Sequence, residues 1–432
     1  MNWLKNFIIY TGHILLFGLL LSCSSSRPSR SDNIAQPMLK SDPFLENLLK
    51  QSPQYFDHIL KYKDSFRVQI IYTQINRTKG NKPVFKTYYF NVNTRQYFYP
   101  ASTVKMPVAL LSLQWLKELR NDQVDLSTTM ITEKGNSIQT EVFNDPTSSD
   151  GRPTIGHYIK KIFLVSDNDA FNRLYELLGP EYINQRLRKM GFRQTEIIHR
   201  LSIPLSEQQN RASNPVRFLD TSMKPLYSKA YHLSTLPLLK RNDFLGKGYI
   251  SEGKLVSQQF NFSQKNRVTL EDLNGMIRSI LFPSSVRISK RFDIAEEDYR
   301  FVWKYMSQYP SETSWPPYDT TEFWDAYCKF LYWGSEKETL PKHLRIFNKV
   351  GDAYGFLTDA AYIVDFEKNI EFMLAATIYC NRDGIFNDDK YEYEEIGFPF
   401  MKNLGRVIYQ YESEREKKIK PDLSEFKMNY DK

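Results

Sequence analysis

The sequence predicts an α+β protein in which an antiparallel sheet is covered by N-terminal and C-terminal helices. Three observations predict this fold. Two strand-like segments follow a first helical stretch, a long apolar helical block occupies the middle of the chain, and three strand-like segments precede a last helix. Strands joined by short turns pair as antiparallel neighbours, and helices bury the faces of the sheet that they form.

The N-terminal half supplies the first helices and a hairpin. Residues 44–62 show a helical apolar stripe that is broken around Pro53. Residues 66–75 and 84–92 are rich in β-branched and aromatic residues, and the turn-forming stretch between them predicts an antiparallel hairpin. Three helices are then expected from apolar spacing and capping residues; they span 102–120, a stretch starting at Thr154, and 169–178.

The C-terminal half alternates irregular segments with clear ones. Residues 220–266 lack periodicity and predict an insertion, and residues 308–342 are rich in Trp, Tyr and Pro. A helix is expected over 268–282. Three strands and a helix follow, with Gly and charged turns between the strands; they are RIFNKVG, GFLTDAAYIVDF, IEFMLAATIYC and a helix over about 399–411, before a charged tail.

Composition excludes several classes of protein. The chain has 432 residues, of which 41% are apolar and 15% aromatic, so it is neither disordered, collagen-like nor a small disulfide scaffold. The formal net charge is +8, but opposite charges are interleaved and no Arg-rich or zinc-finger pattern occurs, so no nucleic-acid partner is expected. The six histidines show no ligand spacing, and no metal or other cofactor is expected.

The first segment has the features of a secretion signal. Lys5 precedes an apolar run from Phe7 to Leu21 that is short for a bilayer span and ends in small residues. Leu20-Leu-Ser-Cys23 resembles the lipobox of bacterial lipoproteins, which implies that residues 1–22 are a signal peptide and that Cys23 is lipidated. The alternative is an ordinary cleaved signal or an anchoring helix with an incidental cysteine.

This resemblance sets an expected location. Several acyl chains on Cys23 would anchor the protein in the bacterial cell envelope, at the outer membrane and facing the periplasm. The Ser-, Arg- and Pro-rich stretch that follows, 23–43, is expected to be a tether. Cys328 and Cys380 form one possible pair in a compartment that permits disulfides, and the sequence leaves open whether they are bonded.

One Ser-x-x-Lys motif stands in a context that suits a nucleophile. Residues three apart share a helix face, so the amine can reach the hydroxyl. Ser102 and Lys105 begin the apolar helix, whose burial would lower the pKa of Lys105 toward that of a working base, and the helix N-terminus offers N–H groups to an oxyanion. Two other copies are interpreted as solvated chance matches; they are Ser251/Lys254 and Ser424/Lys427.

Two further motifs each occur twice, and context selects one copy of each. Ser166-Asp-Asn168 lies between two expected helices, where its short polar side chains can point into a cleft. Lys349-Val-Gly351 closes a strand-like segment, and its glycine permits close backbone approach of a ligand. The discarded copies are Ser31-Asp-Asn33, in the tether, and Lys189-Met-Gly191, at the end of a helix.

In this order the three selected motifs resemble the signature boxes of the class A β-lactamases and related penicillin-recognising serine enzymes. Thr154-Ile-Gly and the helix start VTLEDL also match that family. The resemblance implies the β-lactamase/transpeptidase-like fold, with an all-helical subdomain beside the sheet and the active site between them. It assigns 44–411 to one serine hydrolase domain with insertions near 220–266 and 308–342, and 412–432 to the charged tail.

The chemistry that the resemblance implies is acyl transfer. Ser102 would attack the carbonyl carbon of a β-lactam or a peptide amide and form an acyl-enzyme. Lys105 would act as base or proton relay. Ser166 would pass a proton to the leaving nitrogen.

The resemblance also implies how substrate is bound. Asn168 would hold the amide of the substrate side chain, and Lys349 would attract the substrate carboxylate. The oxyanion hole would consist of two backbone N–H groups, those of Ser102 and of Asp352, the residue after Gly351. The partner is therefore a small β-lactam or cell-wall peptide.

Two departures from the family pattern stand out. The third box usually has Thr or Ser at the position of Val350, so carboxylate affinity should drop unless Thr358 or Tyr354 substitutes. Class A β-lactamases also carry a Glu two residues after an Arg in a loop past the second box, and this Glu activates the deacylating water. Here that position is Ser202, although Glu207 would serve if the loop is longer.

These observations predict a serine hydrolase of the class A β-lactamase type. The alternative of the same chemistry is a penicillin-binding or cell-wall peptidase-like enzyme that deacylates slowly, because the activating Glu is missing. A third possibility is a catalytically weak lipoprotein that binds the cell wall or a partner. The retained serines and lysines argue against that possibility, since a structural role gives no reason to bury a lysine beside a serine.

Overall fold

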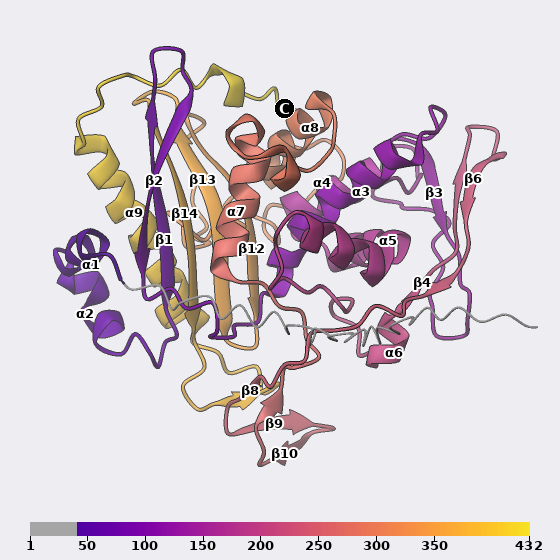
Figure 1. Cartoon of the computed structure of the whole chain (residues 1–432), viewed down its shortest axis with the longest axis horizontal. Helices are drawn as coiled ribbons and strands as arrows, with labels where there is room; N and C mark the ends of the chain where they lie inside the picture. The colour runs from indigo at the N-terminus through magenta and orange to yellow at the C-terminus, as the bar shows by residue number, and fades with distance from the viewer. Residues whose placement is uncertain (1–40) are drawn as a thin grey trace, which may run out of the picture. The chain divides into compact units, whose positions relative to one another are not determined.

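The structure is a computed structural model that describes residues 41–432. Five strands form one antiparallel sheet in it (Figure 1). The order is β12-β13-β14-β1-β2, so the first hairpin pairs with the last three strands of the chain. The predicted antiparallel sheet and α+β class are confirmed. The strands are β1 (Gln69–Arg77), β2 (Pro83–Phe90), β12 (Leu344–Ala353), β13 (Phe356–Asp365) and β14 (Ile370–Tyr379).

The sheet separates two apolar cores because side chains alternate along each strand. In β1, Ile70 and Tyr72 belong to one core, whereas Ile71 belongs to the other. In β12, Phe347 lies in the same core as Ile71, whereas Val350 lies in the core of Ile70. This alternation decides which residues of β12 can reach the active site.

The terminal helices cover one face of the sheet (Figure 1). They are α1 (Pro43–Lys50), α2 (Pro53–Lys61) and α9 (Phe398–Glu414). The helical stretch predicted over 44–62 is thus two helices, because proline at 53 lacks the N–H that a continuous helix needs and instead starts α2. The opposite face carries the predicted α7 (Leu270–Leu281) and an additional helix, α8 (Glu296–Ser307).

A helical part packs beside α7 and α8. It consists of a 3-10 turn (Ala101–Val104), α3 (Lys105–Leu119), α4 (Ile155–Leu164) and α5 (Asn168–Lys189). Gly179, at φ +75°, and Pro180 kink α5, which therefore extends past the predicted end at residue 178. The sequence predicts an all-helical subdomain here, and the structure differs from that prediction. This part also carries a sheet of β3 (Thr129–Thr132), β5 (Val216–Leu219) and β6 (Pro225–Lys229).

The two predicted insertions differ in structure. Residues 220–266 hold short strands, and one of them, β9 (Gly248–Ser251), pairs in parallel with β15 (Ile385–Phe386). Residues 308–342 are mostly irregular around a 3-10 turn, Pro310–Glu312. The other short elements are α6 (Glu207–Asn210), β4 (Ala212–Ser213), β7 (His232–Leu233), β8 (Phe244–Leu245), β10 (Lys254–Val256) and β11 (Phe260–Asn261).

The C-terminal segment, predicted as a charged tail over 412–432, packs against the domain through a few of its residues. Phe426 is fully buried, and its ring contacts the rings of Phe282, Trp303, Phe347 and Tyr362. Lys304 Nζ also lies 2.7 Å from a carboxylate oxygen of Asp431. The segment is rich in charged residues, but the buried ring of Phe426 anchors it. Burial of a Phe side chain contributes about 1.5–3 kcal/mol to stability.

Several predictions concern the N-terminus. The predicted signal peptide, Cys23 and all of the tether before residue 41 lie outside the described residues. Within residues 41–432, no helix is both long enough and apolar enough to span a bilayer. Cys328 and Cys380, the pairing of which the sequence left open, are buried free thiols.

Candidate active site

The three predicted motifs converge on one point between the sheet and the helical part. Ser102 lies in the 3-10 turn that leads into α3, Ser166 lies between α4 and α5, and Lys349 lies in β12. Lys349 Nζ donates to Ser166 Oγ at 2.7 Å, and Lys105 Nζ lies 3.2 Å from the same oxygen. Ser166 therefore sits between two lysines that are far apart in the sequence.

Lys105 is the first residue of α3 and is completely buried. Its amine contacts the carbonyl oxygen and the hydroxyl of Ser166, and Asn168 Oδ1 at 2.7 Å. Burial removes the ammonium from water, and Lys349 repels it, so the pKa of Lys105 lies well below its usual value. The apolar helix predicted both the burial and the direction of this shift.

Lys349 is 2% exposed and also donates to the carbonyl oxygen of Val350 at 2.9 Å. Burial lowers the pKa of Lys349 to about 8. A lysine with this pKa is mostly an ammonium at neutral pH, whereas the pKa of Lys105 is lowered further from its usual value by burial and by the charge of Lys349. The two amines are therefore suited to different roles, the first to attracting an anion and the second to accepting a proton.

Gly351 lets β12 pack against the nucleophile turn. A Cβ atom on this residue would lie 2.6 Å from the carbonyl oxygen of Pro100 and 2.9 Å from the amide nitrogen of Ser102. The close approach that the glycine permits is thus to the chain itself, and the motif lies within β12, which continues to Ala353. This packing brings the backbone of Ser102 beside that of Gly351 and Asp352, where the oxyanion hole was predicted.

The Ser-Asp-Asn segment is held in a defined turn. Ser166 has a φ of +60°, and the carboxylate of Asp167 accepts a hydrogen bond from the Ala170 N–H at 2.8 Å, which caps α5. Lys161 lies 3.5 Å from the Asp167 carboxylate and 3.2 Å from that of Asp145. These contacts orient Ser166 toward the two lysines, and the sequence motifs gave no sign of Lys161.

A cavity of about 410 Å³ opens in front of Ser102. Ser102, Asn168, Ser202 and Asp352 line it, whereas Lys105, Ser166 and Lys349 are not part of its lining. Its remaining lining residues are Tyr99, Ala101, Leu201, Ala353, Tyr354, Asn387, Asp389, Tyr391 and Tyr393. The serine therefore faces the open space with the lysines behind it.

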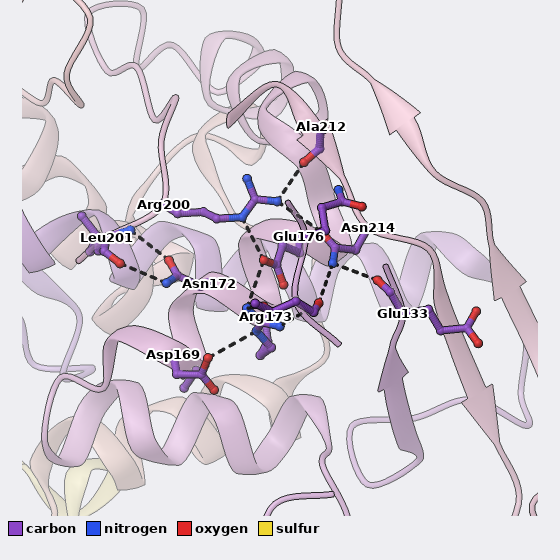
Figure 2. Close-up of polar contacts among 12 residues, drawn as sticks. Glu133, Asp169, Asn172, Arg173, Glu176, Arg200, Leu201, Ala212 and Asn214 are labelled. Atoms are coloured by element: carbon purple, nitrogen blue, oxygen red, sulfur yellow. Dashed lines mark hydrogen bonds and ion pairs between the residues drawn. The ribbon is translucent and has the colours of Figure 1, made fainter. Parts of the chain in front are cut away.

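Ser202, at the sequence position where the family pattern has a Glu, lines the cavity. Its hydroxyl accepts a hydrogen bond from Asn168 Nδ2 at 2.8 Å. The residue before it, Leu201, is fixed by the Asn172 side chain, which donates to the Leu201 carbonyl at 3.0 Å and accepts from its N–H at 2.9 Å (Figure 2). Ser202 is thus held against the site.

A buried ionic cluster also fixes the segment that contains Arg200 and Leu201 (Figure 2). Arg200 Nε donates to the Glu176 carboxylate at 2.8 Å, and Arg173 lies 3.1 Å from the same oxygen. Arg200 also donates to the Ala212 carbonyl at 2.8 Å and lies 3.2 Å from Asn214 Oδ1. Burial raises the pKa of Glu176, and the two arginines oppose that shift, so removing either partner would leave a buried charge.

Glu207 does not replace the missing Glu. It is the first residue of α6, and one of its carboxylate oxygens accepts from the Arg211 guanidinium at 2.9 and 2.8 Å. It is not part of the cavity lining. The possibility that Glu207 activates water at Ser102 is therefore not supported, because its carboxylate is directed to Arg211.

The departure at Val350 has a structural explanation. Val350 is 2% exposed and belongs to the core between the sheet and the terminal helices, so its side chain faces away from Lys349. Thr358, predicted as a substitute donor, is fully buried in β13 and shares a 2.8 Å hydrogen bond with Thr377. Tyr354, the other predicted substitute, lines the cavity.

The sequence motifs did not point to one wall of the cavity. Tyr99 precedes the nucleophile turn, and Asn387, Asp389, Tyr391 and Tyr393 come from a loop after β15. The last four of these residues alternate at every second position, but they lie among turn-forming and charged residues and form no apolar pattern that would mark them as part of a site. Within residues 41–432, no group of three or more His, Cys, Asp or Glu side chains is arranged to hold a metal ion.

Part of the chain matches a known protein family. Residues 54–232 match the family model described as the β-lactamase enzyme family. No curated protein matches the chain. Residues 54–232 contain the first two motifs, Ser102-Thr-Val-Lys105 and Ser166-Asp-Asn168.

Three solved structures are similar to the chain. The class A β-lactamase from Clostridium kluyveri is 14% identical, with 83% of this chain and 98% of that one covered and a TM-score of 0.44. The β-lactamase from Sphaerobacter thermophilus is 12% identical, with 85% and 95% covered and a TM-score of 0.44. PBP-A is 17% identical, with 87% and 98% covered and a TM-score of 0.46. The match of residues 54–232 to the β-lactamase enzyme family supports the β-lactamase/transpeptidase-like family that the motifs predict.

Proposed function

We propose that this protein is a serine acyl-transfer enzyme, in which Ser102 opens a β-lactam or a related peptide amide and releases the acyl group slowly. The observation that supports it most is the contact chain from Lys349 through Ser166 to Lys105, next to the turn that carries Ser102. Two buried lysines on one hydroxyl are costly to fold, so a structural role does not account for them.

The proposed reaction assigns each proton. Lys105, the pKa of which is lowered by burial, accepts the proton of the Ser102 hydroxyl while Ser102 Oγ forms a bond with the carbonyl carbon. Ser166 gives its hydroxyl proton to the amide nitrogen as the C–N bond breaks, and Lys105 returns a proton to Ser166. The Lys349 ammonium attracts the substrate carboxylate, and the backbone N–H groups of Ser102 and Asp352 stabilise the oxyanion.

Slow release follows from the other side of the cavity. Water attack on an acyl-enzyme needs a base, and Asn168 contacts the Ser202 hydroxyl where the family pattern places a carboxylate. Glu207 is paired with Arg211. The two carboxylates that line the cavity, Asp352 and Asp389, come from β12 and the loop after β15. A penicillin-binding enzyme is therefore favoured over an efficient β-lactamase.

A labelled penicillin tests this function. The full chain, purified in mild detergent, is incubated with the penicillin, and its intact mass is measured. We expect one adduct that is absent in Ser102→Ala and retained in Ser251→Ala, which removes the serine of the discarded motif. A missing adduct, or one that persists in Ser102→Ala, would contradict the proposal.

We also propose that Cys23 carries the lipid anchor. The lipobox resemblance of Leu20-Leu-Ser-Cys23 supports it. Cells that express the chain are fed a radiolabelled fatty acid, and the wild type is compared with Cys23→Ala. We expect label in the wild-type band only; a cleaved but unlabelled wild type would show an ordinary signal peptide instead.

A further inference from the structure

The outer wall of the Ser102 cavity is built by segments that the catalytic motifs do not include. Tyr354, at the β12–β13 turn, contacts the rings of Tyr99, Phe260 and Phe262 with centroid distances of 5.0, 5.6 and 5.4 Å. Phe260 and Phe262 belong to the insertion 220–266. This insertion therefore supports the cavity wall.

The same insertion fixes the loop that completes the wall. β9 of the insertion pairs in parallel with β15, and Asn387 Nδ2 lies 3.3 Å from the Ile250 carbonyl oxygen. The Tyr391 hydroxyl accepts from the Asn387 N–H, and the Tyr393 hydroxyl accepts from the Gly355 N–H, each at 2.9 Å. These contacts hold the loop and its lining side chains next to Ser102.

The charge of this wall is one-sided. Asp352 and Asp389 line the cavity together with four tyrosines, and no lining residue is Lys, Arg or His. Within the described part of the chain, neither carboxylate takes part in an ion pair or a side-chain hydrogen bond, although the charges of Lys349 and Lys105 act on Asp352 and oppose the rise in its pKa that burial causes. Carboxylates beside aromatic rings attract an ammonium group, the carboxylates by charge and the rings by cation–π interaction.

We propose that the cavity selects acyl groups that carry a protonated amine, and that Asp389 and Asp352 confer this selectivity. The inference rests on the proposed function and specifies its substrate class. Asn168, which is predicted to hold the amide of the acyl side chain, lines the same cavity as both carboxylates. A natural substrate would be a peptide amide whose acyl side bears an ammonium group.

Three penicillins that share one phenylacetyl side chain test the selectivity. They carry hydrogen, an amino group or a carboxylate on its α-carbon. Acylation rates of the full chain are measured by intact mass at about pH 6, where the amino group of the penicillin is protonated. An exposed ion pair changes a binding constant by up to about five-fold. The amino group is attracted by the aspartates and the carboxylate is repelled, so we expect the amino compound to acylate Ser102 roughly ten times faster than the carboxylate compound.

Variants separate charge from intrinsic reactivity. Asp389→Asn should lower the ratio about three-fold, Asp352→Asn should lower it further, and Asp389→Lys should bring it below one. Asp388→Asn is the matched control, because its carboxylate accepts from the Lys390 N–H outside the cavity lining, and it should leave the ratio unchanged. Raised salt should also reduce the wild-type ratio.

The outcomes distinguish the two proposals. If all three penicillins acylate Ser102 and the ratio is near one, or is the same in Asp389→Asn and Asp389→Lys as in the wild type, the selectivity is refuted and the acyl-enzyme function stands. If none of the three forms an adduct, the proposed function fails and the selectivity fails with it.

Discussion

The two sides of the Ser102 cavity are built differently. Lys105, Ser166 and Lys349 lie on core elements and contact one another directly. The opposite side consists of two segments outside the motifs, the stretch that carries Ser202 and the loop that carries Asp389. From this difference we infer that, under the proposed function, the core elements set whether an acyl-enzyme forms, whereas the outer segments set how long it lasts and which acyl group it accepts.

Removing the buried base should have the largest effect on the inner side. Lys105→Met keeps the length of the side chain and removes its amine, so acylation of Ser102 should slow about 10³-fold, within the range of general-base catalysis. The rate is measured as adduct mass against time. Lys254→Met, in the discarded motif, should acylate at the wild-type rate, and an equal loss in both variants would contradict a specific role for Lys105.

Changing the outer side should alter release and leave acylation in place. Ser202→Glu restores a carboxylate beside Asn168, so loss of the adduct should accelerate about 10²-fold, at the low end of general-base catalysis. The half-life of the adduct is measured after excess penicillin is removed. Ser202→Gln has the same size without the acid and should keep the slow release; equal acceleration by Gln would show that acidity is not the cause.

The pH dependence of acylation should report Lys349. Its pKa is lowered to about 8, so its positive charge, and the attraction for a carboxylate, is present below that pH and is lost above it. Acylation at low penicillin concentration should therefore fall about ten-fold between pH 7 and pH 9. In Lys349→Arg the positive charge persists at pH 9. The acylation rate of this variant should therefore not fall between pH 7 and pH 9, even if the variant acylates more slowly than the wild type at every pH. A decline that is unchanged in this variant would assign it to another group.

The smallest effect is expected at Val350. Because its side chain packs under the terminal helices, Val350→Thr should change acylation less than about two-fold and should lower the free energy of unfolding by about 1–3 kcal/mol through a buried hydroxyl. Thermal or denaturant unfolding measures the second quantity. A clear rise in penicillin affinity would show instead that position 350 reaches the substrate.

Local patterns were sufficient to predict most of the sheet and the inner side of the site. Runs of β-branched, aromatic and apolar residues bounded by turn signals identified all five strands of the main sheet, and three-residue spacing placed Lys105 one turn from Ser102. The apolar helix after Ser102 also predicted that Lys105 is buried. These features depend only on residues that are close together in the sequence, so a single sequence is sufficient to predict them.

The outer side could not be predicted because distant contacts create it. Arg200 meets Glu176 across 24 positions, and the loop at 387–393 is fixed by a strand of the insertion, β9, more than 130 residues earlier. The orientation of Val350 depends on which face of β12 meets the terminal helices. No spacing along the chain encodes such pairings.

The lifetime of the adduct on Ser102 tests the central claim most directly. The full chain is acylated with penicillin, excess reagent is removed, and intact mass is followed with time in the wild type and in Ser202→Glu. We predict an adduct on Ser102 that outlasts the removal of reagent in the wild type and disappears much sooner in Ser202→Glu. Rapid loss from the wild type, or no adduct on Ser102 at all, would contradict the account.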